Sequence, residues 1–342
     1  MITSKIFKKK NILVLGGAGF LGSHLCAELV KNHQVICLDN FISSSVENIR
    51  FLLQNPNFEF IKHDIIQLIN LEELPELKKF NLKVQGIQEI YNFACPTSAK
   101  KFDNYVIETV LTNSQAIKNI LDLVLKYDAK FLHLSSSVVY GPRRGDSYFT
   151  EDDLGAVNFL SPRACYDEGK RFAETMLTTY GRYYKKDFKI ARVFRTYGPK
   201  MMLNDGQMIP DFILDALANR DLVIYGDKNF QTSLCYVDDI IQGLLKFMSS
   251  DLSGPLNLGS QDSLALTEVA QLIIKMTDSQ SKIIYKPPLL FMTPLGLPDI
   301  TKARNRLGWF PLTKLEDGLK KTLAYTKAQR QLLDTQFQQT LE

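Results

Sequence analysis

The sequence offers little metal-binding or disulfide chemistry, because histidine and cysteine are both scarce. Its five cysteines are scattered without a Cys-x-x-Cys pair, which is typical of free thiols in a reducing compartment. The four histidines, His24, His33, His63 and His133, show no metal-ligand spacing. We therefore expect neither a disulfide framework nor a metal site.

Long apolar runs are absent too, so we expect no membrane span. The chain enters its first strand too early for a secretory signal, which favours a cytoplasmic location. The net charge is only +4, and the one compact basic run, Lys8–Lys10, precedes that strand, so no nucleic-acid partner is predicted. A chain of 342 residues can bury one large core or two closely packed domains.

What the sequence does contain is a glycine-rich turn between a strand and a helix. Gly16, Gly19 and Gly22 follow the apolar run Ile12–Leu15 and lead into a helical stretch, Phe20–Val30. A backbone without Cβ atoms can turn tightly and bring a pyrophosphate against the helix N-terminus. The turn therefore predicts a dinucleotide-binding site.

An acid follows the turn at the spacing that this fingerprint requires. Gln34–Asp39 reads as a second strand, and its last carboxylate would accept hydrogen bonds from the adenosine ribose and repel a 2′-phosphate. Asp39 therefore favours NAD over NADP, with a simple strand cap as the alternative interpretation. Asp64, after the next strand, is a candidate for the adenine amino group, and a cap explains it equally well.

Alternating strand-like and helical stretches from residue 10 to about 195 predict an α/β fold with a doubly wound parallel Rossmann sheet. Further strands are expected at Phe58–Lys62, Glu89–Ala94, Phe131–Ser135 and Phe188–Phe194. Long helices are expected at about 104–126 and 161–184.

Turn-rich sequence after Tyr197 predicts a smaller C-terminal α/β substrate lobe. We expect residues 1–198 to form the NAD-binding domain and 199–330 the lobe, with about 235–260 returning to the first domain. Residues 331–342 would be a tail or a frayed helix.

Tyr166 and Lys170 form the only Tyr-x-x-x-Lys spacing in the chain, so they share one helix face. A phenol has a pKa of about 10 and is a poor base at neutral pH until a neighbouring cation favours the phenolate. Leu134–Ser137 would end a strand with hydroxyls at the same sheet edge, where Ser136 could hydrogen-bond a substrate hydroxyl. A serine-rich strand end that only satisfies backbone groups is the alternative.

From these residues the chain resembles the extended short-chain dehydrogenase/reductases (the NAD-dependent epimerase/dehydratase superfamily), and within them most closely the UDP-glucuronate decarboxylases, or UDP-xylose synthases. The resemblance covers residues 11 to about 325. Its distinctive motifs are Asp39–Phe41, Pro96–Ser98, Ser161–Arg171, Asn204–Gly206, Tyr236–Asp239, Asn257–Gly259 and Pro298–Ala303.

The resemblance implies a tightly bound NAD, oxidation of C4 of a nucleotide-linked sugar, and a homodimer. It makes Ser136 the hydroxyl partner, Tyr166 the base and Lys170 its electrostatic support. The cofactor-binding residues are then Gly16, Gly19, Phe20, Leu21, Gly22, Asp39, Asn40, Asp64, Ala94, Tyr166 and Lys170. The substrate-binding residues are Pro96, Thr97, Ser98, Ser137, Asn204 and Thr232. In such a homodimer, the helix that carries Tyr166 would pair with its copy through the apolar residues Phe172, Ala173, Met176 and Leu177. Burial of these residues against the protein's own sheet is the plainer interpretation.

Three positions depart from the decarboxylase pattern. Val138 replaces an acid, and Thr232 and Gly296 replace arginines that in the family serve the sugar carboxylate or the diphosphate. Either the activated sugar differs, or another cation takes over the charge. The candidates are Lys200, Lys228, Lys282, Lys286 and Arg304.

These departures leave the outcome of the reaction open. Val138 disfavours a 4,6-dehydratase, which needs an acid/base at that position, whereas decarboxylation and 4-epimerisation or net 4-oxidation both stay open. A catalytically retired protein that binds NAD or a sugar nucleotide is the alternative function. The missing acid and arginines favour it, and the Tyr166/Lys170 pair argues against it.

Overall fold

The computed structural model describes residues 8–97, 102–143, 145, 148–288 and 294–339. Its centre is a seven-stranded parallel sheet with the order β12-β7-β5-β4-β1-β2-β3. These strands are β1 (Asn11–Leu15), β2 (Gln34–Asp39), β3 (Phe58–Lys62), β4 (Glu89–Asn92), β5 (Lys130–Ser136), β7 (Phe188–Val193) and β12 (Gly254–Leu258). The prediction of a doubly wound Rossmann sheet is therefore confirmed.

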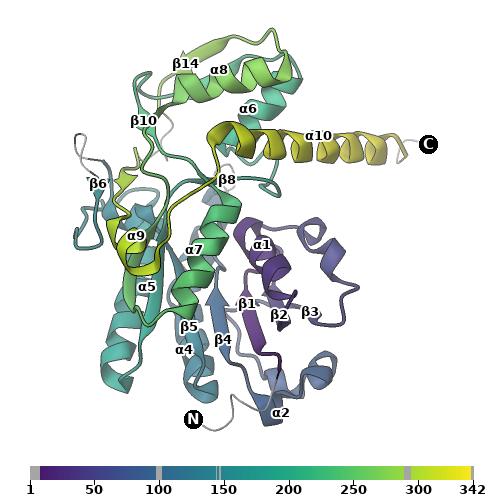
Figure 1. Cartoon of the computed structure of the whole chain (residues 1–342), viewed down its shortest axis with the longest axis vertical. Helices are drawn as coiled ribbons and strands as arrows, with labels where there is room; N and C mark the ends of the chain where they lie inside the picture. The colour runs from purple at the N-terminus through teal and green to yellow at the C-terminus, as the bar shows by residue number, and fades with distance from the viewer. Residues whose placement is uncertain (1–7, 98–101, 144, 146–147, 289–293, 340–342) are drawn as a thin grey trace.

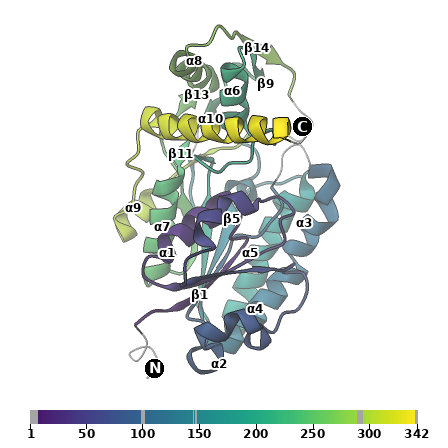
Figure 2. The ribbon, with the colours of Figure 1, turned by 90° about the vertical axis from the view of Figure 1, so that its right-hand side faces the viewer.

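Helices cover both faces of this sheet (Figures 1 and 2). One layer contains α1 (Phe20–Leu29) and α7 (Val237–Ser249), and the other contains α4 (Gln115–Tyr127) and α5 (Ala164–Tyr184). Because both faces are covered, β1 is apolar and buried almost throughout, as parallel strands usually are. The strand order reverses beside β1, so the crevice at the carboxyl ends of β1 and β4 is where ligands of such sheets bind.

The predicted helix over about 104–126 is interrupted in the structure. It divides into α3 (Val106–Thr112) and α4, with a short turn at Phe102–Tyr105 before them. Asn113 at the break is buried, and its side chain donates to the Thr109 carbonyl (2.8 Å) and to the Cys95 sulfur (3.2 Å). Such side-chain hydrogen bonds compete with the helical ladder, and α3 ends at this residue.

A smaller lobe lies above the carboxyl ends of the strands (Figure 1). Its main elements are α6 (Met208–Leu217), β9 (Leu222–Tyr225), α8 (Leu266–Thr277), β14 (Ile283–Lys286) and α10 (Leu315–Gln339). β9 and β14 pair in parallel, and α6, α8 and α10 pack together beside them. Between β9 and α8 the chain leaves the lobe, forms α7 and adds β12 to the edge of the central sheet.

Short elements complete the structure. They include α2 (Leu82–Gln85), which lies far from the lobe, and β6 (Tyr148–Phe149), β8 (Thr196–Tyr197), β10 (Gln231–Thr232), β11 (Cys235–Tyr236), β13 (Leu264–Ala265), β15 (Leu297–Pro298) and α9 (Thr301–Leu307) (Figure 1). Among the described helices, none is both long and apolar enough to cross a membrane.

Candidate functional site

The glycine-rich turn joins β1 to α1, and its geometry leaves no room for side chains. Gly16 has a φ of +73°, and a Cβ there would lie 2.6 Å from the backbone nitrogen of Ala94. A Cβ on Gly22 would lie 2.2 Å from the Gly16 carbonyl oxygen, so α1 touches the turn directly. The close approach of backbone to backbone satisfies the steric requirement for a pyrophosphate at the start of α1.

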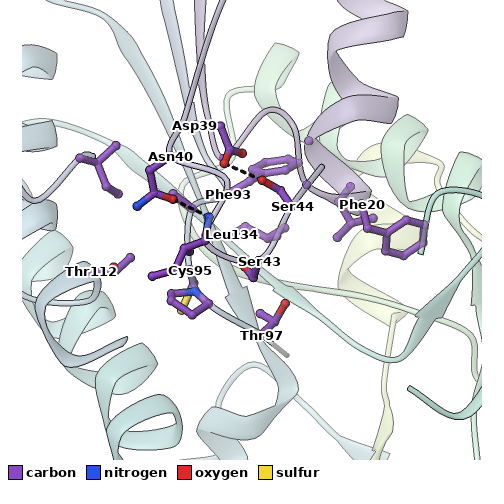
Figure 3. A pocket seen from close by; sticks show the side chains of 18 of the residues that line it. Phe20, Asp39, Asn40, Ser43, Ser44, Phe93, Cys95, Thr97, Thr112 and Leu134 are labelled. Atoms are coloured by element: carbon purple, nitrogen blue, oxygen red, sulfur yellow. Dashed lines mark hydrogen bonds between the residues drawn. The ribbon is translucent and has the colours of Figure 1, made fainter. Parts of the chain in front are cut away.

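Asp39 ends β2 beside this turn (Figure 3). One of its carboxylate oxygens accepts from the Ala18 backbone N–H (3.0 Å). The other accepts from the Phe41 N–H (2.9 Å) and from the Ser44 hydroxyl (2.7 Å). The carboxylate is buried and held in one orientation, which is what recognition of a ribose requires. The residues present therefore fit a dinucleotide.

One cavity contains most of the predicted cofactor residues. Its lining includes Gly16, Gly19, Phe20, Leu21, Gly22, Asp39, Asn40, Asp64, Ala94 and Tyr166, together with Pro96, Thr97 and Ser136. Asp64 accepts from the Asn40 amide (3.2 Å) and the Ile66 N–H (2.9 Å), so it is also a turn cap. Lys170 stands behind this wall, where its ammonium donates to the Leu134 carbonyl (2.9 Å).

A second cavity lies between the sheet edge and the smaller lobe, and Thr97, Ser136 and Tyr166 line both cavities. Ser137 and Val138 line the second cavity from one side, and α6 and β9 line it from the other. The hydroxyls of Thr97, Ser136 and Tyr166 thus lie where the two cavities meet.

The structure separates the other predicted substrate residues. Asn204 has a φ of +59° and lines neither cavity. Thr232 also lines neither, because its side chain is buried and its hydroxyl donates to the Ser233 carbonyl (3.4 Å). Ser98 lies outside the described residues.

The environment of Tyr166 differs from the expectation of an activated phenolate. Burial raises the pKa of Tyr166, and the nearby Cys95 acts in the same direction. The Arg163 guanidinium and a hydrogen bond with Ser136 oppose this rise. The Lys170 ammonium is 5.9 Å from the centre of the Tyr166 ring, and burial lowers the pKa of Lys170 itself. With its pKa raised, the Tyr166 phenol is protonated at neutral pH. Arg163 is a nearby cation that was not predicted from the sequence as a site residue.

The departures from the decarboxylase pattern have a structural explanation at Gly296. A Cβ there would lie 2.3 Å from the ring of Phe149, so an arginine cannot replace Gly296 without moving that ring. Val138 is buried and presents an apolar side chain to the second cavity. Position 138 therefore has no side chain that could act as an acid or a base.

Of the cations proposed to replace the family arginines, Lys200 lines the cofactor cavity, whereas Lys228, Lys282, Lys286 and Arg304 line neither cavity. Burial lowers the pKa of Lys200 to about 8. Its ammonium lies 4.3 Å from the centre of the Phe51 ring, a cation–π contact. Lys200, one of the candidates named from the sequence, directly follows the Tyr197-Gly-Pro199 turn.

We predict that the Lys200 ammonium, which lines the same cavity as the predicted cofactor residues, attracts the diphosphate of NAD, so the affinity for NAD should decrease about 3- to 10-fold between pH 7 and pH 9 as Lys200 loses its proton. The Lys200→Arg variant should keep its affinity for NAD up to pH 9, and the Lys200→Met variant should bind NAD weakly at both pH 7 and pH 9. Calorimetric titration with NAD measures this, and an equal pH dependence in all three proteins would contradict the assignment.

Within the described part of the chain, no three His, Cys, Asp or Glu side chains cluster as a metal site would require.

Comparison with known proteins places these features in a family. A model of the NAD dependent epimerase/dehydratase family matches residues 12–259. The chain is 37% identical over 318 residues to UDP-glucuronic acid decarboxylase 1 of Danio rerio, covering 93% of this chain and 72% of that protein. It is 36% identical over 318 residues to UDP-glucuronic acid decarboxylase 1 of Arabidopsis thaliana, covering 91% and 68%.

The chain is also similar to a solved structure of a nucleotide-sugar enzyme. The UDP-glucuronic acid 4-epimerase of Bacillus cereus, in complex with UDP-glucuronic acid and NAD, superimposes with a TM-score of 0.79 at 27% sequence identity. The match covers 93% of this chain and 99% of that structure.

Proposed function

The chain belongs to the NAD dependent epimerase/dehydratase family and is an NAD-dependent enzyme of nucleotide-sugar modification, and we propose that it oxidises C4 of a nucleotide-linked uronate to a 4-keto sugar. The observation that carries the proposal is the shared wall of the two cavities, where Ser136 and Tyr166 face both. The buried Asp39 carboxylate supports NAD rather than NADP as the cofactor.

In the proposed mechanism, bound NAD supplies the hydride acceptor at C4 of its nicotinamide. Ser136 holds the C4 hydroxyl of the sugar by a hydrogen bond, and Tyr166 takes its proton. Tyr166 has to release its own proton to solvent before it can act as this base, and because burial disfavours the phenolate, the positive charges of Arg163 and Lys170 would stabilise the phenolate until it takes the substrate proton. Val138 helps to exclude water from this end of the cavity.

The 4-keto group determines the second step of the reaction. A ketone β to a carboxylate favours loss of CO₂, and return of the hydride to the opposite face of a rotated sugar gives the 4-epimer. Val138 supplies no acid/base for elimination of water, so dehydration is disfavoured. The proposed reaction therefore ends in decarboxylation, in 4-epimerisation or in net 4-oxidation.

Mass spectrometry of products from UDP-, GDP-, CDP- and dTDP-sugars, uronates included, separates these outcomes. We expect UDP-glucuronate to be converted, with a loss of CO₂ for decarboxylation, no change in mass for epimerisation, and a loss of two hydrogens for net oxidation. A panel in which no sugar is changed, with NAD bound, would contradict the proposed function.

We also propose that residues 1–198 act as the cofactor domain and 199–330 as the substrate lobe. The path of the chain supports this division, because α7 and β12 return to the central sheet while α6, β9, α8 and β14 stay in the lobe. Beyond residue 331 the chain continues as part of α10 rather than leaving the helix at once.

A homodimer is proposed through the exposed face of α3 and α5, which pack side by side (Figure 2). Ile107 is 65% exposed and Phe172 is 51% exposed on this face. Ala173 and Leu177 do not belong to it, because they are buried against the protein's own sheet. The apolar face is therefore narrower than the sequence suggests and involves a second helix.

We expect a dimer at micromolar concentration in sedimentation, because pairing would remove these side chains from water. The double variant Ile107→Asp/Phe172→Asp should sediment as a monomer. Leu68→Asp changes a side chain that is 78% exposed elsewhere and serves as the control. A wild-type monomer would contradict the proposal.

A further inference from the structure

Two arginines that were not predicted as site residues from the sequence line the substrate cavity. Arg163 immediately precedes α5, and its guanidinium carbon is 5.3 Å from the centre of the Tyr166 ring. Arg195 follows β7, at the sheet edge where the strands end. Both line the cavity that also contains Ser136 and Tyr166. Two positive charges thus enter the cavity beside the reactive hydroxyls.

The two arginines differ in how their charges are balanced. The Nε of Arg163 donates to the Asp167 carboxylate at 2.9 Å. Among the described residues, Arg195 has no carboxylate partner, and its guanidinium carbon lies 5.8 Å from the centre of the Phe230 ring. Burial lowers the pKa of Arg195 to about 10, with the charge of Arg163 as the second cause. Arg195 is a desolvated cation whose charged neighbour has the same sign.

The charges on the far wall do not remove this imbalance. Asp211 and Asp215 line the cavity from α6, and Asp215 pairs with Arg220 at 2.8 Å. Neither acid is among the groups that act on the pKa of Arg195. Asp167 therefore offsets the charge of Arg163, whereas no acid is among the groups that act on the pKa of Arg195.

The position of the pair identifies the anion that it suits. In the proposed function Tyr166 acts at C4, and in a hexuronate the neighbouring C5 bears the carboxylate. The diphosphate is attached at C1, on the opposite side of the sugar ring. A carboxylate also matches a guanidinium in shape and carries the single charge that the pair lacks.

We propose that Arg195, together with Arg163, binds the C5 carboxylate of the sugar and makes the enzyme specific for uronates. This inference rests on the proposed function and deepens it. Arg195 would bind the carboxylate in place of the family arginines whose positions are occupied here by Thr232 and Gly296. It lies in a different part of the fold. Arg163 would serve both the carboxylate and the phenol of Tyr166.

The test compares UDP-glucuronate with UDP-glucose, which differ only in a carboxylate against a hydroxymethyl group. Calorimetric titration of the NAD-loaded enzyme gives the affinity for each sugar, and initial rates give C4 oxidation. We expect Arg195→Met to weaken UDP-glucuronate binding about 10- to 100-fold and UDP-glucose binding less than about twofold. Arg195→Lys should retain part of the preference, because it keeps the charge and loses the two-pronged geometry.

Two controls make the result interpretable. Arg182→Met removes an exposed arginine of α5 that lines neither cavity and should leave both affinities unchanged. Affinity for NAD should be unchanged in every variant, which shows that each one is folded. An equal loss for both sugars would assign Arg195 to the diphosphate, and no loss for either would remove it from the site; both overturn the inference. A wild-type enzyme that binds and oxidises neither sugar would instead overturn the proposed function, and the carboxylate assignment with it.

Discussion

Tyr166→Phe is expected to lower turnover about 100- to 10,000-fold while leaving the affinity for NAD nearly unchanged. The substitution removes only the hydroxyl that Ser136 contacts and that would take the substrate proton. The ring would still line both cavities and keep its contact with the Arg163 guanidinium, so the binding surfaces stay intact. The measurements are NAD titration and the rate of C4 oxidation of a sugar that the wild-type enzyme converts.

Tyr183→Phe is the matched control for this experiment. Tyr183 lies on the same helix and is 78% exposed, far from either cavity lining, so neither turnover nor NAD affinity should change. Full turnover in Tyr166→Phe would remove Tyr166 from the chemistry. A wild-type protein that binds NAD and a sugar nucleotide without turning it over would support the retired binding protein instead.

Local sequence signals select the predicted cofactor residues, and most of these residues line one cavity. Gly16 and Gly22 are needed because backbone atoms pass within van der Waals distance of each other, and this requirement is visible in the glycine spacing. Asp39 follows at the distance that one strand, one helix and a second strand impose. Tyr166 and Lys170 share a helix face because four residues make about one turn.

The substrate half depends on contacts between segments far apart in the chain. Gly296 is closed to an arginine by Phe149, about 150 residues earlier, which no local pattern reveals. The proposed role of Arg195 depends on its place in a cavity that lobe residues also line, and on the lack of an acid among the groups that act on its pKa. The pKa of Tyr166 moves upward because burial outweighs nearby cations, and a spacing of residues contains no measure of burial.

A buried network behind the site links its chemistry to the stability of the fold. Arg192 on β7 pairs with Glu174 on α5 through three hydrogen bonds, and the Nη2–Oε2 distance is 2.7 Å. Ser135 donates to the same carboxylate at 2.5 Å, and Arg192 donates to the Tyr140 hydroxyl at 2.9 Å. The Glu174 carboxylate also raises the pKa of Lys170, against the lowering effect of burial.

Arg192→Met should lower the free energy of unfolding by about 3–5 kcal/mol, because it leaves the Glu174 carboxylate buried without its cation. Both side chains are only 12% exposed, so water cannot replace the lost partner fully. The double variant Glu174→Leu/Arg192→Met removes both charges and should recover much of this loss, less about 1 kcal/mol for the hydrogen bond of Ser135.

Urea unfolding of the wild type, both single variants and the double variant gives the coupling energy between Glu174 and Arg192. Lys118→Met, which breaks the exposed pair with Asp122 on α4, should cost no more than about 1 kcal/mol and is the control. A double variant as unstable as Arg192→Met would show that stability comes from the packing of the arginine side chain. Recovery in the double variant would show that the unpaired carboxylate causes the loss, and that strand β7 and helix α5 stay packed behind Ser136 and Lys170 without the ion pair.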